Sequence, residues 1–428
     1  MRLICAPEDY AFAESDALNV VLYGQAGAAE EGRSPRGSAG QAAKTAFLRA
    51  RLEAAPRAWD FLSIALAVVT ADLADWRSES ADGWTRELDL TVAVTDPVFW
   101  NSQAAALETA LKFLSTDRWR LTFVGGGIQP APPGDAARPK EDCVVLLSGG
   151  LDSLIGAIDL AKAGRKPLAV SNIVRGDGDN QAAFATAIGG GLRHLALNHN
   201  ATPPWAKEPS QRARSLIFIA FGVLAATALV EYHNGGEVPF YVCENGFIAI
   251  NPSLTGARLG SLSTRTAHPE FLNRIRDVLS AAGLRVRIIN PYESKTKGEM
   301  MQDCSDQTLL GAHAMQSVSC GRYRVFNYKH CGRCVPCQVR RAAFLAWGKA
   351  DTTYYKFAAL GKNDADHANF DDVRSLAMAI QEVGADGLDA WLGSALAYPR
   401  MGDPKPIRDL VDRGLKELAA LHQQHGVK

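Results

Sequence analysis

The stretch over residues 144–160, VVLLSGGLDSLIGAIDL, constrains the fold of this chain more than any other. Residues 144–147 are aliphatic without interruption, which is typical of a strand buried on both faces. A Ser-Gly-Gly turn ends the strand, and apolar residues then recur at helical spacing from Leu151 onward. A strand, a glycine turn and a helix N-terminus together present free backbone N–H groups to an anion, and glycine allows a phosphate to approach the backbone closely.

The turn and the first helical residues are interpreted as a phosphate-binding loop made up of Ser148, Gly149, Gly150, Leu151, Asp152 and Ser153. The loop lacks the Lys that follows the glycines in the Walker pattern GxxxxGK[ST]. A carboxylate does not pair with phosphate directly, so we expect Asp152 to hold Mg²⁺, which bridges phosphate oxygens. The alternative is that Asp152 and Ser153 only cap the helix. The SGGxDS pattern resembles the pyrophosphate loop of the PP-loop ATP pyrophosphatases, which split ATP into AMP and pyrophosphate.

Composition limits the class of protein. With 428 residues, 47% of them apolar, the chain is expected to form two or three domains with ample core. The formal net charge of zero argues against a dedicated nucleic-acid-binding or membrane-surface protein, and no apolar run is long enough for a membrane span. The N-terminus has no signal-peptide pattern. Eight cysteines, four of them clustered, favour metal ligands in a reducing cytoplasm over disulfides.

Four segments are expected along the chain. Residues 1–128 are predicted to form a separate α/β unit without a catalytic motif, whose role is to dock a partner or cover a substrate; within it, the Gly- and Ala-rich stretch 26–40 is expected to be a mobile loop. Residues 129–141 contain four prolines and are interpreted as a linker. Residues 142–348 alternate strands with helices, which predicts a parallel sheet with its ligand site at the carboxyl ends of the strands. Residues 349–428 are predicted to be a helical extension.

Two candidate site regions follow within residues 142–348. Arg214 is at the head of a buried apolar helix over residues 212–229, where its planar, permanently charged group suits a phosphate; the alternative is that it only solvates the helix end. Glu244 and Asn245 follow a predicted strand. The carboxylate is expected to accept hydrogen bonds from the N1–H and amino edge of a guanine-like base, unless the pair serves only as turn residues.

Two lysines form a third candidate region. Lys295 and Lys297 stand at the predicted start of a helix, where the positive end of the helix dipole makes cations unfavourable. A nearby anion explains their placement, and a solvated charged loop is the alternative. We expect one of them, together with Arg214, to neutralise the α-phosphate of a nucleotide.

Four cysteines have the spacing of a metal site. Cys320, Cys331, Cys334 and Cys337 follow the pattern SC-x10-CGRCVPC, which supplies four thiolates for tetrahedral Zn²⁺. Four sulfur ligands leave no position open for water, so the zinc is expected to be structural. The alternative, a redox-active thiol pair, needs only two cysteines.

The loop SGGLDS followed by CGRCVPCQVRRAAF resembles the 7-cyano-7-deazaguanine synthase (QueC) family over about residues 142–348. The resemblance implies a PP-loop, adenine nucleotide alpha hydrolase-like fold that uses ATP, Mg²⁺ and one structural zinc. It also implies that the carboxylate of 7-carboxy-7-deazaguanine is activated as an acyl-adenylate, which ammonia converts to the amide and, in a second round, to the nitrile. The chain departs from the family at Ser215, where Asn is usual, and at Ala267 and His268, which replace Cys-Arg.

The size and the extensions are most similar to the QueC-like proteins of Qat-type bacterial anti-phage defence loci. This resemblance implies that the acceptor amine belongs to a partner protein from the same operon. We therefore expect a cytoplasmic ATP-dependent carbon–nitrogen ligase that acts on ATP and a 7-deazapurine carboxylate. The alternatives are a synthase using ammonia, a non-catalytic nucleotide-binding subunit of a defence complex, and a tRNA-modifying PP-loop enzyme, which the neutral charge disfavours.

Overall fold

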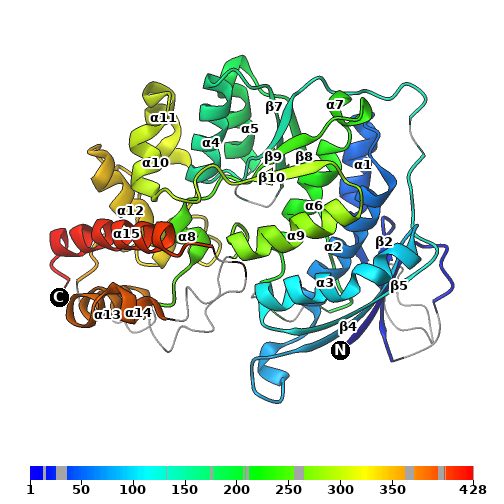
Figure 1. The fold of residues 1–428 in the computed structure, drawn as a ribbon, viewed down its shortest axis with the longest axis horizontal. Coiled ribbons are helices and arrows are strands. Elements are labelled where there is room, and N and C mark those ends of the chain that lie inside the picture. The colour runs from blue at the N-terminus through cyan, green and yellow to red at the C-terminus, as the bar shows by residue number, and fades with distance from the viewer. Residues whose placement is uncertain are drawn as a thin grey trace.

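The computed structural model describes residues 1–12, 16–25, 36–131, 133–173, 176, 178–205, 208, 212–254, 265–361, 371–393, 400 and 402–427. Most of the loop expected over 26–40 lies outside these ranges. Two parallel sheets with flanking helices make up the molecule, and the helices α13–α15 near the C-terminus lie to one side (Figure 1). The predicted α/β class is thus confirmed. Within the described ranges, no helix is both long enough and apolar enough to cross a membrane.

The N-terminal sheet has five parallel strands in the order β3-β2-β1-β4-β5. Its central strand, β1, was not predicted, because it begins at the second residue and is only five residues long. Strand β3 was not predicted either, because it lies within the stretch 26–40 that was expected to be a mobile loop. The bounds are β1 Arg2–Ala6, β2 Leu18–Leu22, β3 Gly37–Ala39, β4 Glu87–Ala93 and β5 Arg118–Val124, with helices α1 Gln41–Arg49, α2 Pro56–Ala74 and α3 Pro97–Ser115 and the short turn η1 Arg77–Glu79.

The second sheet is also parallel, in the order β10-β9-β6-β7-β8. The chain moves from β6 to β7 and β8 in one direction, and β9 and β10 extend the sheet in the other. The order therefore reverses between β6 and β9, and ligands of open parallel sheets bind outside the carboxyl ends of the strands at such a point. The bounds are β6 Cys143–Leu146, β7 Pro167–Asn172, β8 His194–Leu197, β9 Val238–Tyr241 and β10 Val286–Ile289.

Helices of the second half cover both faces of this sheet and continue into the C-terminal region. The buried apolar helix predicted over 212–229 is confirmed as α6, whose residues are nearly all buried. The bounds are α4 Leu151–Lys162, α5 Gly178–Ala187, α6 Ser215–Ala226, α7 Val230–His233, α8 Gly246–Ile250, α9 Pro269–Ala281, α10 Lys297–Asp303, α11 Gln307–His313, α12 Val335–Trp347, α13 Asp371–Asp386, α14 Leu388–Leu392 and α15 Lys405–Gln424.

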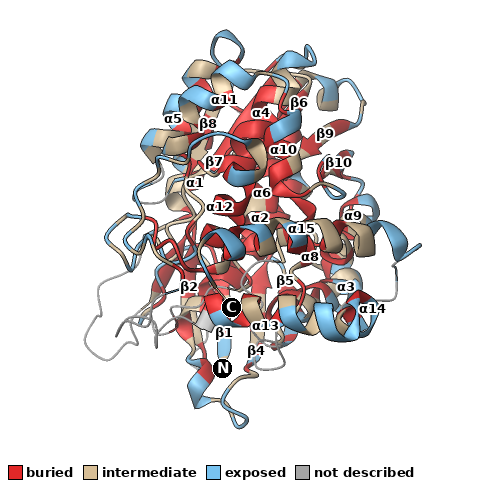
Figure 2. Cartoon of the chain, turned by 90° about the vertical axis from the view of Figure 1, so that its left-hand side faces the viewer, coloured by how far each residue is buried: buried red, intermediate tan, exposed pale blue. Residues whose placement is uncertain are grey.

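One continuous core joins the two sheets. Its buried side chains come from α2 and the N-terminal strands and also from α6 and the second sheet, and Figure 2 shows the buried residues running through α6 and α2. The amide of Ala55 at the start of α2 donates to the hydroxyl of Thr227 at the end of α6 (3.3 Å). Because α2 and α6 share a core, the N-terminal sheet is held firmly against the second one.

A buried group of opposite charges also joins the two halves. Asp72 on α2 accepts a hydrogen bond from Arg86 (2.5 Å), and its second oxygen accepts from the backbone amide of Ala213 (2.8 Å), just before α6. Asp117 accepts from both Arg86 and Arg77. The four charged side chains are at most 6% exposed. Breaking a buried pair leaves an uncompensated charge, so this group fixes how α2 sits beside the start of α6.

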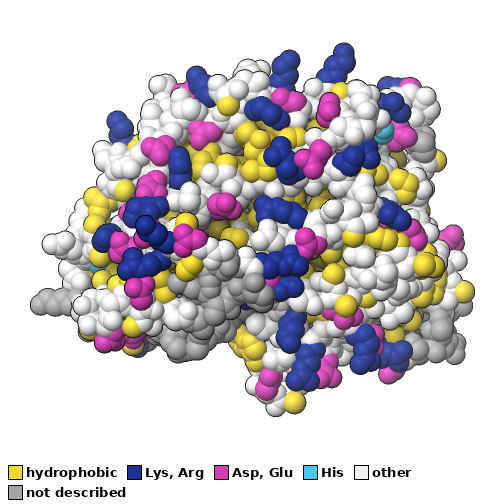
Figure 3. All heavy atoms as spheres, in the orientation of Figure 1, with side chains coloured by type: hydrophobic (Ala, Val, Ile, Leu, Met, Phe, Trp, Pro, Cys, Tyr) yellow, Lys and Arg dark blue, Asp and Glu magenta, His cyan; other side chains and the backbone are white. Residues whose placement is uncertain are grey.

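On the outer surface the charges are mixed. On the face shown in Figure 3, acidic and basic side chains alternate over short distances, in keeping with equal numbers of Lys+Arg and Asp+Glu in the chain, 46 of each.

Candidate functional site

The SGGLDS loop follows β6, where the strand order reverses. Gly149 has a φ of 81°, a left-handed conformation that suits glycine. Its carbonyl accepts a hydrogen bond from the amide of Val318 (2.9 Å). The hydroxyl of Ser153 donates to the carbonyl of Gly150 (3.0 Å) and lies 3.1 Å from that of Ser148, which is exposed at the edge of the sheet. The loop is therefore held in one shape at the place where the fold is expected to bind ligands.

Asp152, in the first turn of α4, is buried and surrounded by donors. One carboxylate oxygen lies 2.6 Å from the ammonium of Lys297, the first residue of α10. The other accepts from the backbone amide of Asn245 (3.1 Å) and from its side chain (2.7 Å). Burial alone would raise the pKa of Asp152, but the Lys297 ammonium and the Asn245 amide outweigh it and hold this pKa below its ordinary value. Asp152 is therefore an ionised anchor for groups from two distant parts of the chain.

Glu244, at the carboxyl end of β9, completes this cluster. Burial and the neighbouring negative charge of Asp152 raise the pKa of Glu244 well above its ordinary value, and the two carboxyl groups share a hydrogen bond. The backbone of Glu244 is fixed by Asn290 beyond β10, which both accepts from its amide (3.3 Å) and donates to its carbonyl (2.9 Å). A carboxyl group, a carboxylate and an ammonium thus lie together beside the phosphate-binding loop.

This pairing predicts a pH dependence of stability that Glu244→Gln removes. Because the pKa of Glu244 in the folded chain exceeds its ordinary value of 4.5, the folded state binds the proton more tightly than the unfolded state. The resulting stabilisation is complete below about pH 4.5 and is lost as the pH rises toward the raised pKa. We expect the stability of Glu244→Gln relative to the unsubstituted chain to improve from pH 5 to pH 8 in urea unfolding. An equal difference at both pH values would contradict a raised pKa.

The donors around Asp152 do not suit a direct magnesium ligand. Magnesium is bound through oxygen atoms, usually of one or two carboxylates. Both oxygens of Asp152 already accept from protein groups, and the Lys297 ammonium stands where a cation would approach. The expectation that Asp152 carries Mg²⁺ therefore does not fit the observed arrangement.

A cavity of about 190 Å³ extends from the loop along the carboxyl ends of β6 and β7 to the start of α6. Phe218 and Phe221 give it an apolar wall, and the guanidinium of Arg214 lies 5.6 Å from the centre of the Phe218 ring. The side-chain oxygen of Asn172 is buried and has no hydrogen-bond partner in the described part of the chain. The cavity is lined by Leu146, Ser148, Val170, Ser171, Asn172, Arg214, Phe218 and Phe221.

The structure therefore brings most of the expected site residues together. Ser148 and Arg214 line one cavity, and Glu244, Asn245 and Lys297 surround Asp152. Lys295 does not join them, because its exposed side chain pairs with Asp303 (3.0 Å). Asn245 is fully buried: it caps α8 by accepting from the amide of Ile248 (3.0 Å) and uses its side-chain amino group on Asp152.

Sequence reasoning missed Asn172 and Asn290. Both are polar residues at or just beyond the carboxyl end of a strand, β7 and β10 respectively. Glu244 was singled out because it follows the carboxyl end of a predicted strand, so the same sequence signal could have identified these two asparagines.

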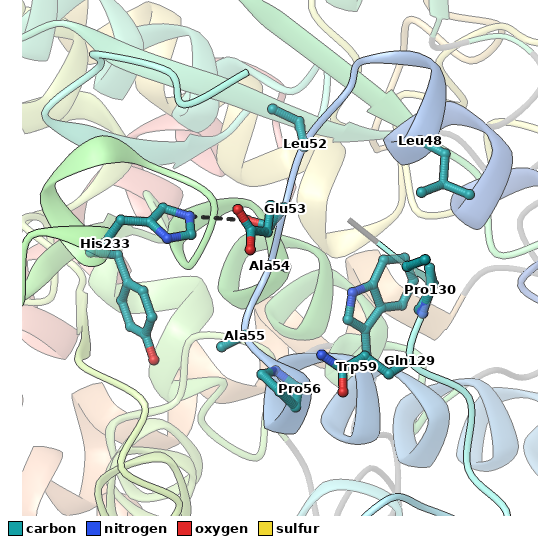
Figure 4. A pocket seen from close by; sticks show the side chains of 12 residues that line it. Leu48, Leu52, Glu53, Ala54, Ala55, Pro56, Trp59, Gln129, Pro130 and His233 are labelled. Atoms are coloured by element: carbon teal, nitrogen blue, oxygen red, sulfur yellow. Dashed lines mark hydrogen bonds between the residues drawn. The ribbon is translucent and has the colours of Figure 1, made fainter. Parts of the chain in front are cut away.

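A second cavity, of about 270 Å³, lies elsewhere (Figure 4). It lies between the segment joining α1 to α2, residues 129–131 and the helix α7. His233 shares a hydrogen bond with the backbone carbonyl of Glu53 there (3.2 Å), and Trp59 forms part of the wall. None of its lining residues belongs to the 148–153 loop, so it is separate from the site described above.

The four expected zinc ligands converge. Their sulfur atoms all lie within 4.8 Å of one another, with Cys331 and Cys337 3.8 Å apart and Cys320 and Cys334 3.9 Å apart. Tetrahedral zinc with Zn–S bonds of about 2.3 Å places its sulfurs about 3.8 Å apart. Backbone amides donate to the sulfurs of Cys320 (3.3 Å) and Cys331 (3.2 Å). The cluster fits a closed structural zinc site, in which the ion would hold the fold together.

This cysteine cluster adjoins the phosphate-binding loop. Val318, two residues before Cys320, donates the hydrogen bond to Gly149 described above. Arg340 on α12 holds the same segment through the carbonyl (3.2 Å) and hydroxyl (2.8 Å) of Ser317. The metal-binding segment and the loop are thus parts of one assembly.

The fold and these two sites define an α/β nucleotide-binding type of protein with a four-thiolate metal site. Comparisons narrow the class. The family model "QueC: Queuosine biosynthesis protein QueC" matches residues 266–348. A 7-cyano-7-deazaguanine synthase of Rhizobium etli is 27% identical over 242 residues, which is 50% of this chain and 91% of the relative. Another, of Alteromonas mediterranea, is 27% identical over 241 residues, 51% of this chain and 100% of the relative. The chain thus matches the QueC family model over residues 266–348 and is similar to 7-cyano-7-deazaguanine synthases over about half of its length.

A shorter match is more similar in sequence. A 7-cyano-7-deazaguanine synthase of Thiobacillus denitrificans is 36% identical over 93 residues, 20% of this chain and 40% of the relative. In the longer matches, about half of this chain aligns with nearly the whole length of each relative. About half of the chain therefore lies outside the shared part.

Proposed function

We propose that the protein uses ATP to adenylate the carboxylate of a 7-deazapurine and then transfers the acyl group to an amine. A carboxylate oxygen attacks the α-phosphorus, the bond between that phosphorus and the bridging oxygen breaks, and pyrophosphate leaves. The amine nitrogen then attacks the acyl carbon, AMP leaves, and the amine proton passes to solvent. The observation that carries the proposal is the SGGLDS loop at the strand reversal, with Lys297 and Arg214 beside it in a chain that matches the QueC family model.

The chemistry needs charge stabilisation more than proton transfer. In the proposal, residues 148–153 hold the departing pyrophosphate, and Lys297 and Arg214 meet the charge on the phosphates. The apolar cavity with the buried acceptor of Asn172 takes the adenine, whose amino group is a donor. Glu244 and Asn245 serve by holding Asp152. Mg²⁺ bound to ATP would supply further positive charge to these phosphates.

The proposed acceptor is an amine of a partner protein in bacterial anti-phage defence of the Qat type, in the cytoplasm. The support is that about half of this chain lies outside the part shared with the synthases. The N-terminal unit over residues 1–128 is the proposed docking part, and a rigid platform suits it better than a moving lid because α2 shares a core with α6.

A pyrophosphate exchange assay tests the activation step. With 7-carboxy-7-deazaguanine present, we expect label to pass from pyrophosphate into ATP, and we expect the exchange to vanish in Asp152→Ala. Absence of exchange with every 7-deazapurine acid tried would favour a non-catalytic nucleotide-binding subunit.

A second candidate is 7-cyano-7-deazaguanine synthesis with ammonia, which the names of the relatives favour. Intact mass spectrometry of operon partners, co-expressed with and without this protein, separates the two acceptors. A deazapurine-sized mass gain on one partner supports the protein acceptor. Unchanged partners together with a nitrile product from ammonia support the synthase.

A further inference from the structure

The helix α15, near the C-terminus, lies directly behind the phosphate site. It packs on α8, which follows Glu244 and Asn245, and Figure 1 shows the two helices side by side. Glycines permit this close approach. A Cβ on Gly246 would lie 2.5 Å from a methyl group of Leu410, and one on Gly414 would lie 2.3 Å from the ring of Phe247.

Glu417 on α15 contacts both residues that flank Lys297. Its carboxylate accepts a hydrogen bond from the hydroxyl of Thr296 and another from the backbone amide of Gly298. A Cβ on Gly298 would lie 2.5 Å from the same carboxylate oxygen, so only glycine leaves room for this contact. The residues on either side of Lys297 are thus tied to one side chain of the C-terminal helix, Thr296 through its hydroxyl and Gly298 through its backbone amide.

Lys297 depends on such support because its side chain is long. The lysine stem has four rotatable bonds, so it gives up many conformations when its ammonium is held in one place. The side chain is nevertheless directed inward, with its ammonium 2.6 Å from Asp152 and with 6% of the residue exposed. A fixed starting point for the stem reduces the number of conformations that must be given up to make this contact.

We infer that Glu417 is a positioning residue for Lys297, and that the C-terminal helix α15 helps to shape the proposed phosphate site through it. The family match ends at residue 348, and Glu417 lies well beyond it. The effect on catalysis rests on the proposed function, whereas the effect on the place of Lys297 does not.

Removing Glu417 should leave α10 folded. Thr296 also accepts from the amide of Glu299 (3.1 Å), and Glu299 accepts in turn from the amide of Thr296 (2.8 Å), which caps the helix independently. Arg413 contacts the side chain of Glu299 (2.5 Å) and gives α15 a second link to α10. The substitution therefore loosens the anchor next to Lys297 without removing the helix.

Labelling of lysine with an acylating reagent, followed by peptide mass spectrometry, tests the inference. In Glu417→Ala we expect Lys297 to react about tenfold faster, because the residues on either side of it lose their hydrogen bonds to the C-terminal helix. Glu417→Gln keeps a side-chain oxygen as acceptor and should react much as the unsubstituted chain does. Leu418→Ala is the matched control, because Leu418 is 1% exposed in the core beneath α15 and should lower stability without changing Lys297 labelling.

A titration with ATP adds a second readout. ATP should protect Lys297 from acylation, and Glu417→Ala should need about tenfold more ATP for the same protection. Equal rates of Lys297 labelling in Glu417→Ala and the unsubstituted chain would overturn the inference. An increase in the labelling rate in Leu418→Ala as large as that in Glu417→Ala would also overturn it. If ATP protects no variant but Glu417→Ala still labels faster, the proposed function fails and the positioning role stands.

Discussion

Lys297→Met is expected to lower kcat/KM for the ATP-dependent exchange by about 10²–10³-fold, the loss that follows removal of one preorganised charge-stabilising donor. The methionine has a similar length but no charge, so the proposed phosphate site loses a buried cation. Asp152 loses the ammonium 2.6 Å from its oxygen and keeps the donors Asn245 and Glu244. Its negative charge then faces the incoming phosphates without compensation, which adds to the loss.

Lys295→Met is the matched control for this substitution. The two lysines are two residues apart, but Lys295 is exposed and paired with Asp303. Exposed ion pairs contribute about 0–1 kcal/mol, so we expect the activity of Lys295→Met to stay within about twofold of the unsubstituted chain. Equal losses in the two variants would contradict the assignment of Lys297.

The SGGLDS turn between a strand and a helix and the convergence of four cysteines could be predicted because each depends mainly on residues close together in the sequence. The SGGLDS turn lies within six residues, and three of the four cysteines lie within seven. The order of the strands could not be predicted from local sequence, because it depends on which distant segments of the chain pair with one another. The sequence also left Lys295 and Lys297 equivalent. The fold distinguishes them, because the start of α10 brings the ammonium of Lys297 to Asp152, in the first turn of α4.

The partners of Asp152 show why the rest of the site could not be predicted. A lone carboxylate after a glycine turn suggests a metal ligand. The fold instead brings Asn245 from beyond β9 and Lys297 from α10 to its two oxygens, 93 and 145 residues away in the chain. Glu417 is similarly distant from its partner Thr296, 121 residues further along the chain. Contacts of this kind leave no local pattern, because each residue is an ordinary helix or loop residue in its own segment.

Loss of the zinc site is expected to have the largest effect on stability. Structural zinc binds four-ligand peptides with about 10–16 kcal/mol of free energy, which is comparable to or larger than the stability of a whole domain, about 5–15 kcal/mol. Cys331→Ser removes the central thiolate of the cluster, which accepts amide hydrogen bonds and lies 3.8 Å from Cys337. We expect this variant to lose its zinc, measured by metal analysis, and to unfold at a much lower temperature.

Because Val318 ties the metal-binding segment to Gly149, the loss of zinc should also reach the nucleotide site. We expect Cys331→Ser, and the unsubstituted chain after treatment with a chelator, to lose the rise in unfolding temperature that ATP produces. Cys304→Ser is the matched control, since Cys304 is buried and free but lies outside the cluster, and it should keep one zinc per chain. If Cys331→Ser retained both its zinc and its response to ATP, the four-thiolate site and its link to the phosphate-binding loop would be wrong. Loss of zinc with an intact response to ATP would show that the loop keeps its shape without the metal.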